Sequence, residues 1–238
     1  VETAFLPMYQ LSYFPNNQNV NGVQAYDKEV DALNQHTKAD KVYIVCSKEQ
    51  LDENGSMKIF SMIDKLSAEL SVASDNETKK RLLMRRAIAH SVLRDFEAAI
   101  SDFTYYISLD DKNSLAYWQR AVCQAEMDEF NKAEGKGVLN IHSAEADFSD
   151  AIRQNSNNAY IYYNRGNLHA GRNELSKAID DYTIALRIDN RLAEAYYNRG
   201  IARAKSGNKQ TAIQDLSKAG ELGLYDAYSV IKRLNKSK

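Results

Sequence analysis

The sequence predicts an all-α fold in which antiparallel helix pairs stack into a solenoid. Three observations support this prediction. The residues YYNRG occur twice, at 162–166 and 196–200, and the sequence around them repeats with the same spacing of 34 residues. Apolar residues recur at helical spacing on both sides of a short turn within each repeat. The chain of 238 residues contains only 2 prolines and 10 glycines, which favours helices over a turn-rich β fold.

Four repeat units can be aligned, at 80–113, 114–158, 159–192 and 193–226. The second unit is longer because an insertion at 131–140 separates its two halves. A glycine or alanine recurs at one position of the first helix, at Ala87, Ala121, Gly166 and Gly200. A second small residue recurs in the second helix, at Ala99, Ala144, Ala178 and Ala212. Small residues at these positions let the two helices of a pair approach closely.

This pattern resembles the tetratricopeptide repeat (TPR) family, whose signature places aromatic and small residues at fixed offsets over 34 residues. The third unit matches the signature at Tyr162, Gly166, Ala178, Tyr182 and Ala185. The fourth unit matches it at Tyr196, Gly200, Ala212, Leu216 and Ala219. The family's closing proline is replaced by Asp111, Ser156, Asn190 and Leu224. The resemblance implies a TPR-type right-handed superhelix whose concave face is lined by the first helix of each pair.

The regions flanking the repeats are predicted to close the array. Residues 227–238 predict a C-terminal capping helix, with Ala227, Val230, Ile231 and Leu234 covering the end of the stack. Residues 56–79 predict a partial repeat, whose helix places Phe60, Ile63, Leu66 and Leu70 on one face.

Residues 1–55 do not follow the repeat. FLPMYQLSYF and KVYIVCS have strand character, residues 26–36 look helical, and NNQNVNG indicates a loop. We interpret this region as an irregular adapter or capping segment with an α+β character.

The composition does not indicate a nucleic-acid-binding or membrane protein. The net charge of −1 gives no electrostatic reason to expect nucleic acid or an anionic membrane as a partner. No run of apolar residues is long enough for a membrane span. The chain begins at Val1 without a signal-like segment, so we expect a processed or shortened form of a soluble protein, in the cytoplasm or the periplasm.

No residue pattern predicts a catalytic site, a metal site or a cofactor, so we expect a protein that is not an enzyme. GKGV at 135–138 lacks the residues that would make a phosphate-binding loop. Cys46 and Cys123 have neither a disulfide framework nor a metal-ligand spacing. His90 and His169 occupy equivalent positions of two units, where a packing role is expected.

The resemblance implies a binding surface on the concave face, where aromatic and amide side chains gather. Amides can both donate to and accept from a peptide backbone, and aromatic rings suit interfaces. The candidate ligand-binding residues are Trp118, Gln119, Tyr160, Tyr163, Asn164, Asn167, Tyr197, Asn198 and Lys205. The alternative for the tyrosines is that they pack between neighbouring helices.

These features predict a protein–protein interaction scaffold that binds a peptide or protein segment in its concave groove. The alternative is an accessory subunit of a cell-envelope or transport assembly. That subunit would contact partners through residues 1–55 or the 131–140 insertion, and its own chain would fill the groove. Self-association is left open.

An arginine and an aspartate recur in phase in all four units. The arginines are Arg86, Arg120, Arg165 and Arg199, and the aspartates are Asp102, Asp147, Asp181 and Asp215. An unpaired buried charge is costly, so each arginine is expected to pair with an aspartate of its own or an adjacent unit. The alternative, a row of arginines that grips an acidic ligand, is weaker because the aspartates would neutralise it.

Overall fold

The computed structural model describes residues 4–13, 28–35, 40–46, 51–136 and 141–236. The chain divides into two compact units, which are considered separately. Unit 1 comprises Val1–Tyr9 and Asn157–Lys238, and unit 2 comprises Gln10–Ser156. The predicted NNQNVNG loop and residues 137–140 of the insertion lie outside the described residues.

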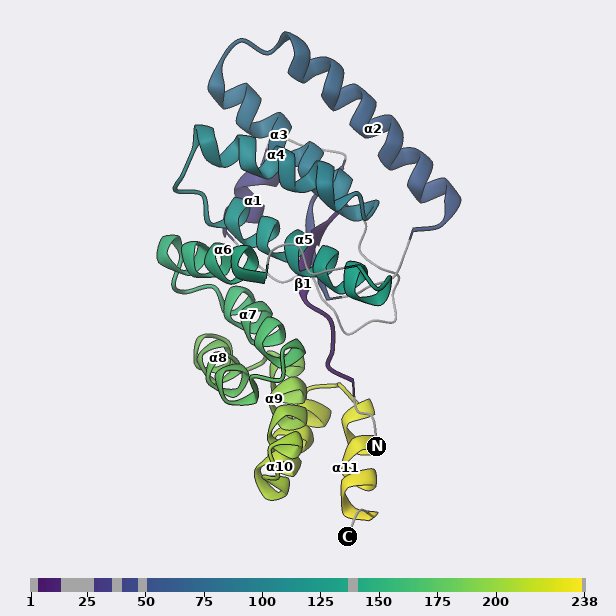
Figure 1. Ribbon diagram of the computed structural model, residues 1–238, viewed down its shortest axis with the longest axis vertical. Helices are drawn as coiled ribbons and strands as arrows, with labels where there is room; N and C mark the ends of the chain where they lie inside the picture. The colour runs from purple at the N-terminus through teal and green to yellow at the C-terminus, as the bar shows by residue number, and fades with distance from the viewer. Residues whose placement is uncertain (1–3, 14–27, 36–39, 47–50, 137–140, 237–238) are drawn as a thin grey trace. The chain divides into compact units, whose positions relative to one another are not determined.

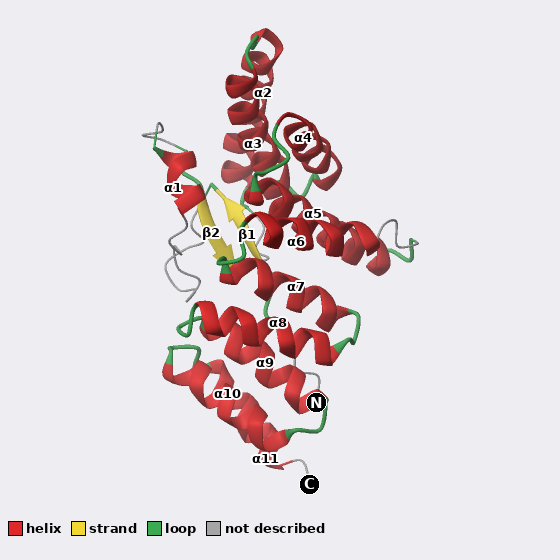
Figure 2. Cartoon of the chain, turned by 90° about the vertical axis from the view of Figure 1, so that its left-hand side faces the viewer, coloured by secondary structure: helices red, strands yellow, loops and turns green. Residues whose placement is uncertain are grey.

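Unit 2 combines a small two-stranded sheet with the first helix pairs. Strand β1 (Tyr9–Ser12), whose first residue belongs to unit 1, pairs with β2 (Tyr43–Cys46), as Figure 2 shows in yellow. The helices are α1 (Lys28–Asn34), α2 (Glu53–Val72), α3 (Asn76–Val92), α4 (Phe96–Leu109), α5 (Ser114–Ala133) and α6 (Ile141–Gln154). Helix α3 packs on α4, and α5 packs on α6, which gives one pair for each of the first two repeats.

Unit 1 contains the two most regular repeats and a last helix. Its helices are α7 (Ala159–Gly171), α8 (Leu175–Ile188), α9 (Ala193–Lys205), α10 (Lys209–Glu221) and α11 (Asp226–Lys236). Each helix packs on the next one in the chain, and the pairs α7–α8 and α9–α10 are visible in green in Figure 1. The predicted all-α solenoid with a terminal capping helix and a small α+β region within residues 1–55 is confirmed.

Short polar residues start several helices. The side chains of Asp52, Asp75, Asp95, Asn113 and Asn158 each accept a hydrogen bond from a backbone N–H in the first turn. Such caps satisfy donors that have no partner within the helix. The turns inside the last two repeats use left-handed backbone at Asn173 (φ 62°) and Gly207 (φ 84°), a conformation that asparagine and glycine tolerate.

The recurring small residues mark the closest helix contacts. A Cβ added at Gly166 would lie 2.7 Å from a ring carbon of Tyr182, and one added at Gly200 would lie 2.8 Å from Leu216. The equivalent Ala87 in unit 2 is fully buried. The small side chains therefore allow an aromatic or leucine of the second helix to pack directly against the first.

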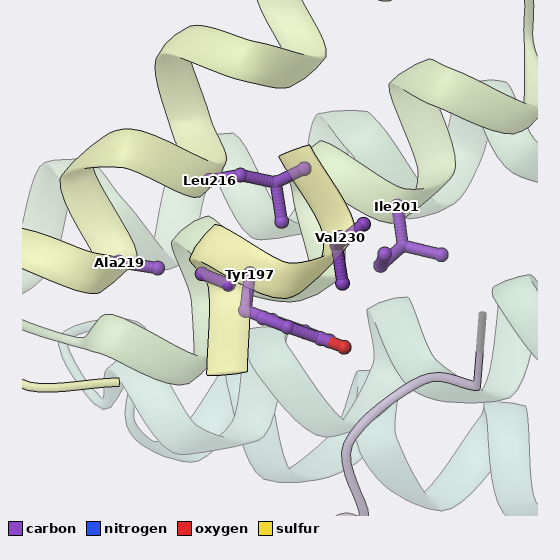
Figure 3. Close-up of a cluster of buried hydrophobic side chains, with 6 residues drawn as sticks. Tyr197, Ile201, Leu216, Ala219 and Val230 are labelled. Carbon is purple, nitrogen blue, oxygen red and sulfur yellow. The ribbon is translucent and has the colours of Figure 1, made fainter. Parts of the chain in front are cut away.

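Helix α11 covers the end of unit 1. Figure 3 shows side chains of α9, α10 and α11 meeting in one apolar cluster. Its buried members are Tyr197, Ile201, Leu216, Ala219, Ala227 and Val230. Ile231 and Leu234 pack against it from the same helix. All four apolar residues predicted to cap the stack thus contribute to this cluster.

The structure differs from the sequence expectations in two elements. In α2 the buried residues are Ile59 and Leu66, whereas Phe60 is 58% exposed, so the prediction that Phe60 shares the buried face is wrong. Because α2 packs mainly on α3, only one narrow stripe of its residues is buried. Helix α5 continues to Ala133, so the insertion begins as an extension of that helix.

Candidate functional site

The candidate site in unit 1 is the face of α7 and α9 that carries the predicted amides and tyrosines. Residues 5–9 of the chain lie against this face. We call these five residues the N-terminal segment. Their contacts join positions more than 150 residues apart in the sequence.

Two asparagines hold the backbone of the N-terminal segment. Asn164 of α7 accepts from the Tyr9 N–H through Oδ1 (2.8 Å) and donates to the Tyr9 carbonyl through Nδ2 (2.7 Å). Asn198 of α9 makes the equivalent pair with Leu6, at 2.8 Å and 3.1 Å. An amide that pairs with both backbone groups of one residue recognises an extended chain without reading its side chain.

Tyr163 and Asn167 add a second set of contacts on the same face. The Tyr163 hydroxyl donates to the Pro7 carbonyl at 2.9 Å, and Asn167 Nδ2 donates to the Leu6 carbonyl at 2.9 Å. The Tyr163 hydroxyl and Asn167 Oδ1 also lie 2.9 Å from Asn198 Nδ2, whose two hydrogens are shared among these groups and the Leu6 carbonyl. Tyr182 Oη of α8 donates to Asn167 Oδ1, so the hydrogen-bond network extends to α8. This bond helps to fix the orientation of the Asn167 amide.

The side chain of Tyr9 enters the site most deeply. Its ring packs against Tyr160 and Tyr163, with centroid distances of 4.7 and 5.1 Å. Its hydroxyl donates to Glu194 Oε2 at 2.7 Å. Burial raises the pKa of Glu194, and the hydrogen bond from Tyr9 opposes that increase by stabilising the carboxylate.

The other end of the N-terminal segment rests on apolar side chains. Phe5 and Leu6 pack against the cluster under α11 that contains Tyr197 and Ile201. The Lys205 ammonium lies over the Phe5 ring, 5.2 Å from its centroid, in cation–π geometry. The site therefore combines backbone pairing with apolar contacts to the side chains of Phe5, Leu6 and Tyr9.

In unit 2, a second group of predicted residues contacts the stretch after Tyr9. Gln119 of α5 accepts from the Leu11 N–H at 2.9 Å. The Tyr13 hydroxyl donates to the Arg85 carbonyl at 2.7 Å, and the Arg85 guanidinium donates to the Asp40 carbonyl. These contacts use the same first-helix face as in unit 1.

The structure divides the predicted ligand-binding residues into three groups. Those that contact the N-terminal segment or the residues after it are Gln119, Tyr160, Tyr163, Asn164, Asn167, Asn198 and Lys205. Tyr197 lies in the apolar cluster under α11. Trp118 is 0% exposed and lies in the core of unit 2.

Sequence reasoning missed Leu6 and Tyr9 as members of the site, and it left Glu194 out of the candidate ligand-binding residues. Glu194 occupies the second position of its repeat, which the family pattern already places on the concave face. No periodic signal could have identified Leu6 and Tyr9, because they lie outside the repeats.

Each recurring arginine makes two parallel hydrogen bonds to the aspartate of its own repeat. The Nε and Nη2 atoms donate to the two carboxylate oxygens at 2.7–2.9 Å in the pairs Arg86–Asp102, Arg120–Asp147, Arg165–Asp181 and Arg199–Asp215. The aspartates are almost fully buried, with 5–9% of each side chain exposed. This bidentate geometry links the two helices of every repeat.

The third nitrogen of three of these arginines reaches the preceding helix. Nη1 donates at 3.0 Å to a hydroxyl of Ser67, Thr104 or Thr183. The sequence contains a signal for this contact, because a serine or threonine follows two residues after every recurring aspartate, at Thr104, Ser149, Thr183 and Ser217. Arg165 and Arg199 also lie over the rings of Tyr162 and Tyr196.

Among the described residues, no group of three or more metal-ligating side chains could hold an ion. Burial raises the pKa of Cys123 to about 12, so its thiol stays protonated and is a poor nucleophile. His169 pairs with Glu174 at 2.8 Å across the turn between α7 and α8. Within the part of the chain that the structure describes, no helix is long and apolar enough to span a membrane.

Comparisons with known proteins agree with this architecture. The sequence model of the TPR repeat matches residues 170–207. The crystal structure of MamA superimposes with a TM-score of 0.61 at 20% identity, over 76% of this chain and 99% of that chain. MamA from Desulfovibrio magneticus RS-1 gives a TM-score of 0.51 at 17% identity, over 69% of this chain and 94% of that chain.

A thermophilic TPR protein from Thermus thermophilus gives a TM-score of 0.56 at 15% identity, over 76% of this chain and 95% of that chain. At these identities the similarity concerns the fold. A comparison with curated proteins found no match. The 34-residue period, the paired helices and the match of residues 170–207 to the repeat model lead to one conclusion: the chain has a solenoid fold of the tetratricopeptide repeat type.

Proposed function

We propose that this chain is a non-enzymatic interaction scaffold that binds an extended segment of a partner protein on the α7–α9 face of unit 1. The observation that carries the proposal is the pair of asparagines, Asn164 and Asn198. Each of them forms a two-way pair with the backbone of one residue in an extended chain. Such pairing gives affinity for any extended segment, and the neighbouring rings and Glu194 add selectivity.

The test is affinity capture of partners by the full chain and by two variants. Asn164→Ala with Asn198→Ala removes both backbone pairs, whereas Asn190→Ala changes an exposed asparagine in the turn before α9. We expect wild type and Asn190→Ala to recover the same partner and the double variant to lose it. Recovery of that partner by a folded double variant would contradict the proposal.

A second candidate function has its own support. The N-terminal segment already covers the α7–α9 face, so this face can be a permanent internal contact, with partners binding elsewhere. The helical extension of α5 and the turn at Glu134–Lys136 are exposed and carry Lys132 and Lys136. Lys132→Glu with Lys136→Glu should then abolish capture, and the asparagine double variant should leave it intact.

A further inference from the structure

The groups that would bind a partner in unit 1 are already occupied. Asn164, Asn198 and Tyr163 are each 0% exposed, because the N-terminal segment covers them. A partner segment can therefore form the same hydrogen bonds only after residues 5–9 have left the face.

The N-terminal segment can leave without breaking a helix. The backbone groups of Leu6 and the carbonyl of Pro7 bond to side chains of α7 and α9 and not to a helical ladder. Residues 5–8 remain partly exposed, and only Tyr9 is buried. Segments held in this way open at a much lower free energy than packed helices do.

We propose that the N-terminal segment is a built-in competitor for the α7–α9 face. The partners that displace it present an extended chain with a leucine and, three residues later, a tyrosine. This inference rests on the proposed function of the face. Leu6 and Tyr9 are the two residues whose backbones the asparagines hold, and their side chains enter the two apolar parts of the site.

Glu194 supplies the selectivity for tyrosine. Its buried carboxylate accepts the Tyr9 hydroxyl at 2.7 Å. A phenylalanine at this position would keep the ring contacts with Tyr160 and Tyr163 but would leave the carboxylate without that donor. An unpaired buried acceptor is penalised, so replacing tyrosine by phenylalanine should weaken binding about tenfold.

Attachment to the chain strengthens the competitor. A tethered segment acts at an effective concentration of roughly millimolar. The apparent affinity of a free peptide falls in proportion to the fraction of molecules in which the face is open. A free copy of the segment should therefore bind the wild-type chain at least about tenfold more weakly than a chain whose own segment is disabled.

The experiment measures binding of a capped, fluorescein-labelled peptide with the sequence of residues 4–10 by fluorescence anisotropy. The full chain is compared with Leu6→Ala plus Tyr9→Ala, which removes the two side chains that enter the apolar parts of the site. Leu6→Pro is a second variant, since it removes the N–H that donates to Asn198 Oδ1 together with the leucine side chain. Met8→Ala is the control, because Met8 lies between the two residues that the asparagines hold.

We expect tight binding to both disabling variants and weak binding to wild type and Met8→Ala. Adding Asn164→Ala and Asn198→Ala to the double variant should abolish binding, and the phenylalanine peptide should bind about tenfold more weakly than the tyrosine peptide. Persistence of binding after the asparagine changes would place the peptide elsewhere and overturn the proposal.

The remaining outcomes separate the competitor from the proposed function. Equal affinity for wild type and the disabling variants would refute the competitor role of the N-terminal segment. It would not contradict the proposed function of the α7–α9 face. Binding to none of the chains, while circular dichroism shows a native fold and hydrogen exchange shows a freed segment, would refute both.

Discussion

At the scale of single residues, the arginine–aspartate pairs explain why an arginine recurs where the helix packs against its partner. In the last two repeats the guanidinium lies over the ring of a tyrosine in the same helix, and its N–H groups donate to one carboxylate in the next helix. Burial raises the pKa of Asp147, and the hydrogen bonds from Arg120 oppose that increase. The carboxylates are therefore buried groups that depend on their partners.

Asp181→Asn tests this dependence, with Asp180→Asn as the matched control. The first change leaves Arg165 without its carboxylate, while the second alters an exposed neighbour in the same helix. We expect Asp181→Asn to lower the free energy of unfolding by about 2–4 kcal/mol and Asp180→Asn by less than about 0.5 kcal/mol. Urea denaturation measures both. Equal effects would show that the pair contributes nothing specific.

Gly166→Ala tests the close helix contact, with Gly171→Ala as its control in the same helix. The added Cβ would meet the Tyr182 ring at 2.7 Å, whereas nothing lies within 4 Å of a Cβ at Gly171. Overpacking at Gly166 should lower the free energy of unfolding by about 1–3 kcal/mol. Gly171→Ala should be neutral or stabilising by up to about 1 kcal/mol. Similar thermal unfolding midpoints for the two variants would argue against the contact.

At the scale of elements, the sequence predicted the repeats well and the N-terminal segment poorly. Helices α7 to α10 follow from two copies of one pattern, and each copy strengthens the interpretation of the other. The segment occurs once, and its partners Asn164 and Asn198 lie 155 and 192 residues away. Local propensity gave residues 5–9 strand character, but it contains no information about which distant surface an extended chain will meet.

Hydrogen exchange of individual amides tests the two asparagine pairs separately. The amides of Leu6 and Tyr9 should both be protected in the wild-type chain, because Asn198 and Asn164 accept from them. Asn198→Ala should remove the protection of the Leu6 amide before it affects the Tyr9 amide. The Leu11 amide, which Gln119 holds in unit 2, serves as the internal reference and should keep its protection. Loss of protection at Leu11 to the same extent would indicate general unfolding instead of a lost pair.

The N-terminal segment should also detach more readily as the pH rises above 4.5, the ordinary pKa of a glutamate side chain. Burial raises the pKa of Glu194 above its ordinary value of 4.5, Asp189 adds to the increase, and the Tyr9 hydroxyl opposes it. The docked state therefore holds its proton to a higher pH than the released state does, so deprotonation favours release.

Exchange of the Tyr9 amide, corrected for its intrinsic pH dependence, should report this effect. Glu194→Gln is the matched control and should show a flat profile over the same range. Parallel profiles for the two chains would mean that another group titrates.

At the scale of the whole molecule, both units are built mainly from helices that follow one another in the chain. The stability of such an array is close to a sum of terms between neighbours, so the two ends need protection. In unit 1, α11 supplies it by burying Ala227 and Val230 against α9 and α10. Phe5 and Leu6 add a contact to the same cluster from the other end of the sequence.

Val230→Ala should therefore unfold the array from its end. Val230 is 1% exposed, and removing its two methyl groups should lower the stability of the terminal helices by about 2 kcal/mol. Hydrogen exchange should accelerate in α11, α10 and α9, with a decreasing effect along that series and none in α3 to α5. Ser229→Ala, an exposed change one residue earlier in the same helix, should leave the pattern unaltered. Uniform acceleration in all helices would instead mean that the chain unfolds as one cooperative body, because coupling limited to neighbouring helices cannot carry the change that far.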